Sequence, residues 1–315
     1  MNLDQIELHP VKVPLVTRFR RVDWREAVLI RGPEGWGEFS PFPDYPPETT
    51  SRWLAAALEA ACTPWPRPGR THVEVNTTIP AVEPERAAEM AAASGCRTAK
   101  VKVAEPGCDF DLDLARVAAV REALGPNGRL RIDVNGAWEV DDAVERIRVL
   151  ARYDLEYVEQ PVSTIPEMVE VRKRVGVPIA ADESIRRAAD PLEVVTAGAA
   201  DVLVLKPQPL GGWRRLVSIA RRTETPVVVS SALETSVGLA AAVYAAASLD
   251  ELPYAAGLGT ATLLAGDVTS QPLVPVGGMV EVRRPVPDLV DRWEADRETA
   301  SRLLERLRRA AELLT

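Results

Sequence analysis

The sequence is poor in the side chains that most often bind metals or form disulfides. Of its 315 residues, 2 are histidine and 3 are cysteine. The cysteines, Cys62, Cys96 and Cys108, are odd in number and show no C-x-x-C spacing, which argues against a disulfide framework or a metal-sulfur centre. His9 and His72 lie away from the predicted strand ends described below, so a histidine metal triad or Ser-His-Asp catalysis is poorly supported. Acid-base chemistry would then fall to lysine or carboxylate side chains.

The sequence also lacks long apolar runs and an excess of basic residues. No apolar run reaches the roughly 18 residues that a membrane-spanning helix needs. The first seven residues lack the basic and apolar regions of a signal peptide, so we expect a cytoplasmic protein. The net charge of −8 argues against nucleic acid or an anionic membrane as a partner. Nothing in the sequence indicates the oligomeric state.

The composition is that of a soluble globular protein, with 46% apolar and 27% charged residues. Residues 1–70 predict a separate α+β module. Segments 26–31 and 35–39 flank the turn composition Gly-Pro-Glu and predict a hairpin, and a helix is expected over roughly 50–62. The proline-rich segment 63–69 is typical of a linker.

From His72 onward the sequence alternates between strand and helix patterns. Strands are predicted near 72–79, 98–104, 129–134, 155–160, 178–182, 201–206, 225–231 and 253–259. Continuous apolar runs such as 226–229 are typical of buried parallel strands. Eight strands with seven intervening helices predict a (β/α)7β TIM-like barrel over residues 71–270.

Two segments have a clear helical pattern. Val117, Val120 and Leu124 follow the i, i+3, i+7 spacing of an amphipathic helix, which Gly125 can cap. A charged helix is expected from about 288 to 314. This last helix could pack on the N-terminal module or extend the outer layer of the barrel, and we group part of 271–315 with the N-terminal module.

Charged residues recur at the ends of the predicted strands. The steps between Lys102, Asp133, Glu159, Asp182 and Lys206 are 31, 26, 23 and 24 residues, about one strand plus one helix each. In a closed parallel barrel all strand carboxyl ends open onto one mouth, where active sites form. These side chains are therefore expected to converge on one pocket, which indicates an enzyme.

Two interpretations of the converging charges are open. Side chains alternate along a strand, so Lys100 and Lys102 share a face, as do Asp133 and Asn135. The acidic side chains could simply form structural ion pairs with the lysines. Three carboxylates also suit a hard divalent cation, Mg²⁺ first and Mn²⁺ as an alternative. We favour the metal interpretation, because three acids without a cation would crowd one mouth.

The same residues carry a resemblance to a known family. The set Lys100-x-Lys102, Asp133-x-Asn135, Glu159-Gln160-Pro161, Asp182-Glu183-Ser184 and Lys206-Pro207 resembles the enolase superfamily, in its muconate-lactonizing subgroup. Gly35-Trp36-Gly37-Glu38 is similar to the strand that opens the capping domain of that superfamily. Members use a lysine or histidine base beside bound Mg²⁺. The resemblance thus implies a capping domain over residues 1–70, metal ligands at Asp133, Glu159 and Asp182, and catalytic lysines at Lys102 and Lys206.

Within that subgroup the chain is most similar to the family of o-succinylbenzoate synthases. The stretches Ser230–Gly238 and Gly257–Ala261 resemble the seventh and eighth strand ends of that family, and the eighth lacks the Asp-x-Asp of dipeptide epimerases. The resemblance implies a hydro-lyase of menaquinone biosynthesis that acts on a small carboxylate. Its reaction would be the Mg²⁺-dependent syn-dehydration of 2-succinyl-6-hydroxy-2,4-cyclohexadiene-1-carboxylate to 2-succinylbenzoate.

The resemblance also implies a set of substrate contacts, namely Lys100, Asn135, Ser230, Ser231, Gly257 and Arg20. For the serines and glycines ordinary loop chemistry is the alternative. The resemblance also implies that a loop with Arg18, Arg20 and Arg21 closes over the site and meets a substrate carboxylate. For these arginines the alternative is a solvated basic face. Three other functions stay open at this point: an N-acylamino acid racemase or dipeptide epimerase, a muconate cycloisomerase, and a barrel that binds without catalysis.

Overall fold

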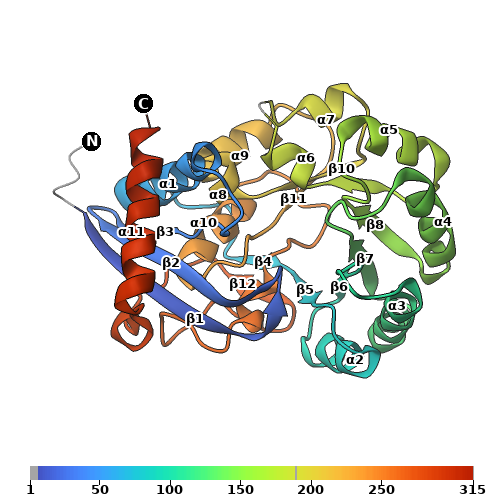
Figure 1. Ribbon diagram of the computed structural model, residues 1–315, viewed down its shortest axis with the longest axis horizontal. Helices are drawn as coiled ribbons and strands as arrows, with labels where there is room; N and C mark the ends of the chain where they lie inside the picture. The colour runs from blue at the N-terminus through green and yellow to red at the C-terminus, as the bar shows by residue number, and fades with distance from the viewer. Residues whose placement is uncertain (1–5, 189, 315) are drawn as a thin grey trace.

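The computed structural model describes residues 6–188 and 190–314 (Figure 1). Its N-terminal part is an antiparallel sheet of three strands, β1 (Glu7–Phe19), β2 (Val22–Gly32) and β3 (Gly35–Phe39), covered by helix α1 (Pro47–Cys62). The predicted hairpin and helix are therefore confirmed. In the described part of the chain no helix is long and apolar enough to cross a membrane.

Strand β1 was not predicted, because prolines interrupt its apolar alternation. Pro10 and Pro14 lie opposite Val28 and Trp24 of β2. Proline cannot donate to a ladder, but the sheet order β1-β2-β3 makes β1 an edge strand, where proline is tolerated. The prolines thus obscure the strand pattern in the sequence, although they are compatible with an edge strand in the sheet.

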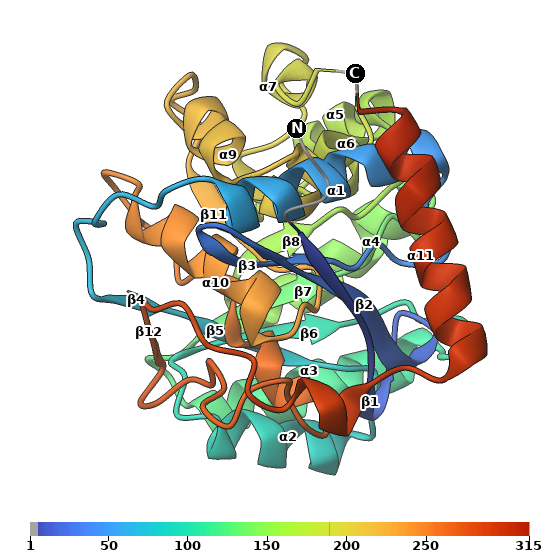
Figure 2. The same cartoon turned by 90° about the vertical axis from the view of Figure 1, so that its left-hand side faces the viewer.

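The C-terminal helix α11 (Arg297–Glu312) packs on this N-terminal part (Figure 2). Leu303, Leu307 and Ala310 belong to the same buried cluster as Val28 and Trp53. Of the two packing arrangements left open by the sequence, the helix adopts the first. A 3-10 turn over Val290–Trp293 precedes it, so the helix is shorter than the sequence pattern indicated.

The central sheet is parallel and curled, with each strand hydrogen-bonded to the next in chain order. Its strands are β5 (Asn76–Ile79), β6 (Thr98–Lys102), β7 (Arg129–Asp133), β8 (Leu155–Glu159), β9 (Ile179–Ala181), β10 (Val202–Leu205) and β11 (Val227–Val229). The expected TIM-like architecture is confirmed.

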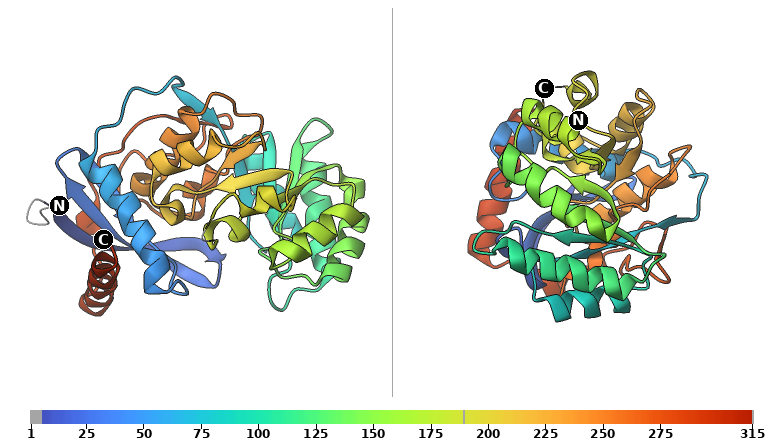
Figure 3. Two further views of the ribbon diagram at one scale, coloured as in Figure 1. Left: turned by 90° about the horizontal axis from the view of Figure 1, so that it is seen from above. Right: turned by 90° about the vertical axis from the view of Figure 1, so that its right-hand side faces the viewer.

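Helices cover the outside of this sheet (Figure 3). They are α2 (Pro84–Ala93), α3 (Phe110–Leu124), α4 (Val140–Leu150), α5 (Ile165–Arg174), α9 (Trp213–Ala220) and α10 (Ser236–Ala247). The short helices α6 (Glu183–Arg186) and α7 (Glu193–Thr196) follow β9, and the short α8 (Pro207–Leu210) follows β10. In α3, Val117 and Val120 are buried, and Gly125 ends the helix with a φ of 67°. The predicted capping glycine is therefore confirmed.

Two predicted strands differ in the structure. Segment 72–79 is divided: β4 (His72–Glu74) pairs antiparallel with β12 (Met279–Glu281), and only β5 joins the barrel. The predicted strand 253–259 forms no regular strand and contacts its neighbours through the single bridges Val75–Ala256 and Ser230–Gly257. Glycine weakens a strand, and Gly257 and Gly259 both fall in this segment. Arg131 also joins this segment to the first barrel strand β5. It donates to Asn76 Oδ1 at 3.0 Å and to the Ala255 carbonyl at 2.8 Å.

Buried polar contacts join the N-terminal sheet to the barrel. Arg25 Nε donates to the Leu233 carbonyl at 2.7 Å, on the turn after β11. Glu38 Oε2 accepts from Thr235 Oγ1 at 2.5 Å and from the Gly238 backbone N–H at 3.0 Å, in the first turn of α10. The N-terminal sheet therefore holds the segment that leads from the seventh barrel strand into its helix.

Candidate active site

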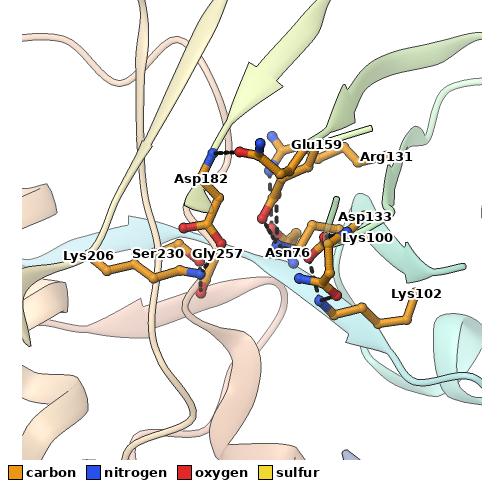
Figure 4. Close-up of polar contacts among 12 residues, drawn as sticks. Asn76, Lys100, Lys102, Arg131, Asp133, Glu159, Asp182, Lys206, Ser230 and Gly257 are labelled. Carbon is orange, nitrogen blue, oxygen red and sulfur yellow. Dashed lines mark hydrogen bonds and ion pairs between the residues drawn. The ribbon is translucent and has the colours of Figure 1, made fainter. Parts of the chain in front are cut away.

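The charged residues predicted from the sequence meet at the carboxyl edge of the barrel sheet (Figure 4). Lys102, Asp133 and Glu159 are the last residues of β6, β7 and β8 and are register partners. Asp182 and Lys206 directly follow β9 and β10. All five side chains are buried. In Figure 4 the two lysines extend toward the centre from opposite sides.

The two lysines of β6 pair with the carboxylates at the ends of β7 and β8. Lys100 Nζ lies 2.8 Å from both carboxylate oxygens of Glu159. Lys102 Nζ donates to Asp133 Oδ2 at 2.5 Å and to Asn135 Oδ1 at 2.6 Å. The ion pairs that the sequence left open as an alternative are thus present.

The opposite side is built from β9, α6 and β10. Lys206 Nζ donates to Asp182 Oδ2 at 2.5 Å. Arg186 lies four residues after Asp182 in the first turn of α6, and its Nε is 3.2 Å from Asp182 Oδ1. Its Nη atoms bond Tyr45 and Glu183. Among the described residues, Asp182 Oδ1, Glu183 Oε2 and Arg186 Nε make no hydrogen bond.

The three carboxyl groups differ in acidity because their neighbours differ. Burial raises the pKa of Glu159 to about 7, and the nearby Asp133 charge adds to this effect. Burial acts in the same direction on Asp133, but Lys102 and Lys100 outweigh it and lower the pKa of Asp133. At Asp182 burial is likewise outweighed, here by Arg186 and Lys206, and its pKa is about 2.

The pKa values of the two lysines of β6 are shifted in opposite directions. Burial alone would lower the pKa of Lys100, but the Glu159 and Asp133 charges outweigh it and raise that pKa. The pKa of Lys102 is lowered, because burial, helped by the Lys100 charge, outweighs the pull of Asp133. Lys102 therefore loses a proton more readily than its neighbour.

A small cavity of about 30 Å³ lies among these groups, under a roof from the N-terminal sheet and the turn after β11. Phe19, Arg20, Phe42 and Leu233 contribute to its lining. A larger cleft of about 390 Å³ adjoins it and shares Arg20 and Asn135 with it. A cavity of this size has room for about two water molecules, so a cyclic substrate does not fit it unless the roof moves.

The remaining predicted site residues also lie on this small cavity. It is lined by Lys100, Lys102, Asn135, Lys206, Ser230, Ser231 and Gly257, besides Arg20. A Cβ at position 257 would come 2.4 Å from Ser230 Oγ and 3.0 Å from Ser230 Cβ, so a larger residue there would require Ser230 to shift. Ser231 Oγ pairs with Thr260 Oγ1 at 2.6 Å. Arg18 is exposed and turns back to the Arg21 carbonyl.

Some lining residues were missed by the sequence reasoning, namely Phe19, Phe42, Thr78, Arg186 and Thr260. For Arg186 a signal existed, because it follows Asp182 by four residues and a helical turn brings such residues together. Phe19 and Phe42 come from the N-terminal part, and no periodic pattern connects them with the barrel mouth.

The donor set of this site fits a hard cation, although its side chains are turned toward ammonium groups. Within residues 6–188 and 190–314 no three acidic, histidine or cysteine side chains are already gathered as a ligand set. The buried Asp182 Oδ1 without a hydrogen bond and the mutual repulsion between Glu159 and the two aspartates favour a bound cation. Such a cation would have to take the place of ammonium groups at these oxygens.

The fold and this ring of lysines and carboxylates define the class of the protein. Residues 83–287 match the family described as enolase C-terminal domain-like, and residues 11–61 match enolase N-terminal domain-like. The chain belongs to the enolase superfamily, as the sequence motifs predicted.

Curated relatives narrow the class further. An o-succinylbenzoate synthase of Thermobifida fusca is 62% identical over 86% of each chain. One of Mycolicibacterium smegmatis is 52% identical over 91% of this chain and 89% of its own. The chain therefore belongs to the o-succinylbenzoate synthase family, whose relatives are enzymes of the lyase class.

Solved structures agree on the fold. The L-Ala-D/L-Glu epimerase of Bacillus subtilis in a substrate-liganded complex has a TM-score of 0.75 at 25% identity, over 89% of this chain and 96% of that one. A dipeptide epimerase of Enterococcus faecalis, complexed with Mg and the dipeptide L-Leu-L-Tyr, has a TM-score of 0.75 at 24% identity, over 90% and 98%. A metal cofactor is expected from the membership of the chain in the enolase superfamily.

Proposed function

We propose that this protein carries out the syn-dehydration of 2-succinyl-6-hydroxy-2,4-cyclohexadiene-1-carboxylate to 2-succinylbenzoate, a step of menaquinone biosynthesis in the cytoplasm. The observation that carries the proposal is that Lys102 and Lys206 line one cavity from opposite sides. The high identity with o-succinylbenzoate synthases supports the choice of substrate.

Lys102 is assigned as the base. Its lowered pKa makes the neutral amine more accessible, and a neutral amine can remove the proton α to the substrate carboxylate. The ammonium that forms then returns this proton to the departing hydroxyl on the same face. Water leaves, the ring becomes aromatic, and Lys102 ends in its starting state. Asn135 would hold its Nζ in place meanwhile, since Asn135 Oδ1 accepts from it at 2.6 Å.

Lys206 is assigned as a cation on the opposite face. It approaches the cavity from β10, paired with Asp182, and would stabilise negative charge that develops on the ring and its carboxylate. Lys100 is held by two hydrogen bonds to Glu159 and has a raised pKa, so it stays charged and suits a substrate oxygen rather than proton transfer.

We further propose Mg²⁺ as the bound cation, with Mn²⁺ as an alternative. Asp133, Glu159 and Asp182 would hold it, since oxygen ligands are what these ions prefer. When bound, the ion supplies positive charge against the substrate carboxylate. The protein's own part is to present the three carboxylates from adjacent strand ends and to exclude water beneath the roof of the cavity.

The remaining predicted contacts concern the substrate. Ser230, Ser231 and Gly257 lie together on the barrel side of the cavity, where Gly257 leaves room next to Ser230. Arg20 lies on the roof, between the cavity and the larger cleft, in a turn whose residues Arg20 and Arg21 have φ of 47° and 64°. We propose that this turn admits the substrate and that Arg20 then meets a carboxylate.

The test is direct incubation with the cyclohexadiene substrate, followed by the absorbance of the aromatic product. The matched arm uses N-succinylated amino acids in deuterated water, because a lysine on each face also suits two-way proton transfer. We expect dehydration. Rapid α-deuterium exchange with inversion, and no dehydration, would favour the racemase instead. No reaction in either arm, with metal supplied, would favour a binding barrel.

A further inference from the structure

The end of strand β6, which carries Lys102, lacks a strand neighbour on one side. Val103 N–H donates to the Asp133 carbonyl of β7 at 3.1 Å. Successive residues of a strand point their backbone groups to opposite sides, so the Lys102 carbonyl faces β5. Strand β5 ends at Ile79, opposite Val101, and the chain then turns, with the Val82 N–H donating to the Pro80 carbonyl at 2.8 Å, so β5 supplies no further N–H to this edge of β6. Another donor is needed there.

Arg116 of helix α3 supplies that donor. Its Nη1 donates to the Lys102 carbonyl at 3.2 Å, and its Nε donates to the Val82 carbonyl at 2.5 Å, in the segment that follows β5. The guanidinium thus spans the gap between the chain after β5 and the end of β6. Arg116 has no exposed surface, so its charge is not available to solvent or to a ligand.

Asp113 completes the arrangement from one turn earlier in α3. Its Oδ1 accepts from Arg116 Nη1 at 2.6 Å, and its Oδ2 accepts from the Ala104 N–H at 2.7 Å. Ala104 has a φ of 60°, a conformation that a non-glycine residue adopts only when its surroundings hold it there. Asp113 is 2% exposed. The pair therefore holds the backbone on both sides of Val103.

We propose that Arg116 and Asp113 are positioning residues for Lys102. The inference rests on the proposed function, since it gives the clamped residue the role of base. Holding the Lys102 carbonyl and the Ala104 amide fixes the Cα from which the lysine side chain reaches the cavity. A displacement of about 1 Å at a reacting group can cost on the order of 10²-fold in rate. Neither residue touches the cavity itself.

The experiment compares Arg116→Met, Arg116→Lys and Asp113→Asn with the control Arg121→Met. Arg121 lies on the same helix but bonds the Gly125 and Gly128 carbonyls, beyond its other end. We expect Arg116→Met to lower kcat roughly 10- to 100-fold with KM nearly unchanged. Arg116→Lys should recover part of the loss, because it restores one donor. Asp113→Asn keeps the volume and covers the case in which Arg116→Met does not fold.

Two further readouts separate positioning from mere stability. With substrate deuterated at the carbon that loses its proton, the isotope effect on kcat should rise in the Arg116 and Asp113 variants and not in Arg121→Met. Amide hydrogen exchange at Val103 and Ala104 should accelerate in the same variants, and this readout needs no substrate. Folded variants with wild-type kcat and isotope effect would overturn the inference, whatever their melting temperature.

The failure of the proposed function is distinguishable from the failure of this inference. If the wild-type protein exchanges the α-proton of N-succinylated amino acids instead of dehydrating the cyclohexadiene, the same variants are assayed for the rate of exchange. A clamp that positions Lys102 slows that exchange as well. If Lys102→Ala retains the wild-type rate of either reaction, Lys102 is not the base, and the assignment of Arg116 as its positioning residue falls with it.

Discussion

The two sides of the pocket differ in how completely their polar atoms are bonded. On the β6–β8 side, defined by Lys100, Lys102, Asp133, Asn135 and Glu159, every buried side-chain nitrogen and oxygen has a partner within the described chain. On the β9–β11 side, defined by Asp182, Glu183, Arg186, Lys206 and Glu234, four of the five residues keep a buried atom without a hydrogen bond. Polar groups of this kind are costly unless something pairs with them.

This difference indicates that the two sides of the pocket have different roles. On the β6–β8 side the polar atoms pair with one another, and a cation at Asp133 and Glu159 would displace Lys102 and Lys100 from these carboxylates. On the β9–β11 side Glu234 Oε1 has no hydrogen bond within the described chain, and Asp182 Oδ1 has only the ion-pair contact with Arg186 Nε at 3.2 Å. We infer that the substrate completes this second side, and that the cation lies between the two sides, on Asp182 of one and Asp133 and Glu159 of the other.

Metal removal should have the largest effect. Exhaustive chelation is expected to abolish turnover, and added Mg²⁺ to restore it, because the three carboxylates repel one another without a cation. Mg²⁺ should also raise the melting temperature of the wild-type protein, since a ligand that binds only the folded state stabilises it. Asp182→Asn should lose most of that increase. Full activity after metal removal would contradict the proposed cation.

Loss of the base is expected to rank second. Lys102→Ala should lower turnover by at least ~10²-fold, the lower end for a lost general base. Lys102→Arg should fail as well, because guanidinium does not lose its proton in proteins. Product absorbance measures both variants, and circular dichroism controls for folding. A rate close to wild type in either variant would mean that Lys102, on the β6–β8 side, is not the base.

A milder loss is expected at Lys206. Lys206→Arg keeps the positive charge, so dehydration should fall by roughly 10-fold, less than the 10²- to 10³-fold loss typical of a deleted charge-stabilising donor. Lys206→Met is the matched variant without charge and should show that larger loss. If racemisation were the reaction, Lys206→Arg would instead lose two-way proton transfer altogether. Steady-state rates with the cyclohexadiene substrate distinguish these outcomes.

The smallest effect concerns stability rather than rate. Burial raises the pKa of Glu38 to about 7 in the folded protein, from an ordinary value of 4.5. The folded state then binds more protons than the unfolded state between these values, so its stability falls as pH rises from about 4.5 to 7. The total is on the order of 3 kcal/mol. Chemical denaturation at several pH values should show this slope in the wild type and a flatter one in Glu38→Gln. Equal slopes would reject Glu38 as its source.

The chain order of charged residues was the most predictable part of the site. In a parallel barrel the strand ends share one edge, so a single period places Lys102, Asp133, Glu159, Asp182 and Lys206 together. The same reasoning fixed the fold class, because continuous apolar runs separated by helices allow few other architectures.

Other features depend on partners far away in the sequence. The prolines of β1 look like breaks until β2 makes β1 an edge strand. The eighth strand looked regular, but Gly257 lies against Ser230 and allows only single bridges. Arg116 acts on the Lys102 carbonyl, and no side-chain pattern reveals which backbone group will lack a donor. The pairing of each carboxylate with a particular ammonium was likewise open in the sequence.

The contacts of Arg25 and Glu38 have a consequence for chimaeric proteins. One wall of the pocket depends on two segments about 200 positions apart, because Arg25 bonds the Leu233 carbonyl and Glu38 holds the first turn of α10. Recombination that exchanges only the first 70 residues between relatives would separate these partners. We expect such chimaeras to lose stability and activity. Both should recover when the segment 230–238 is exchanged together with the N-terminal part, because the exchange brings the original partners together again.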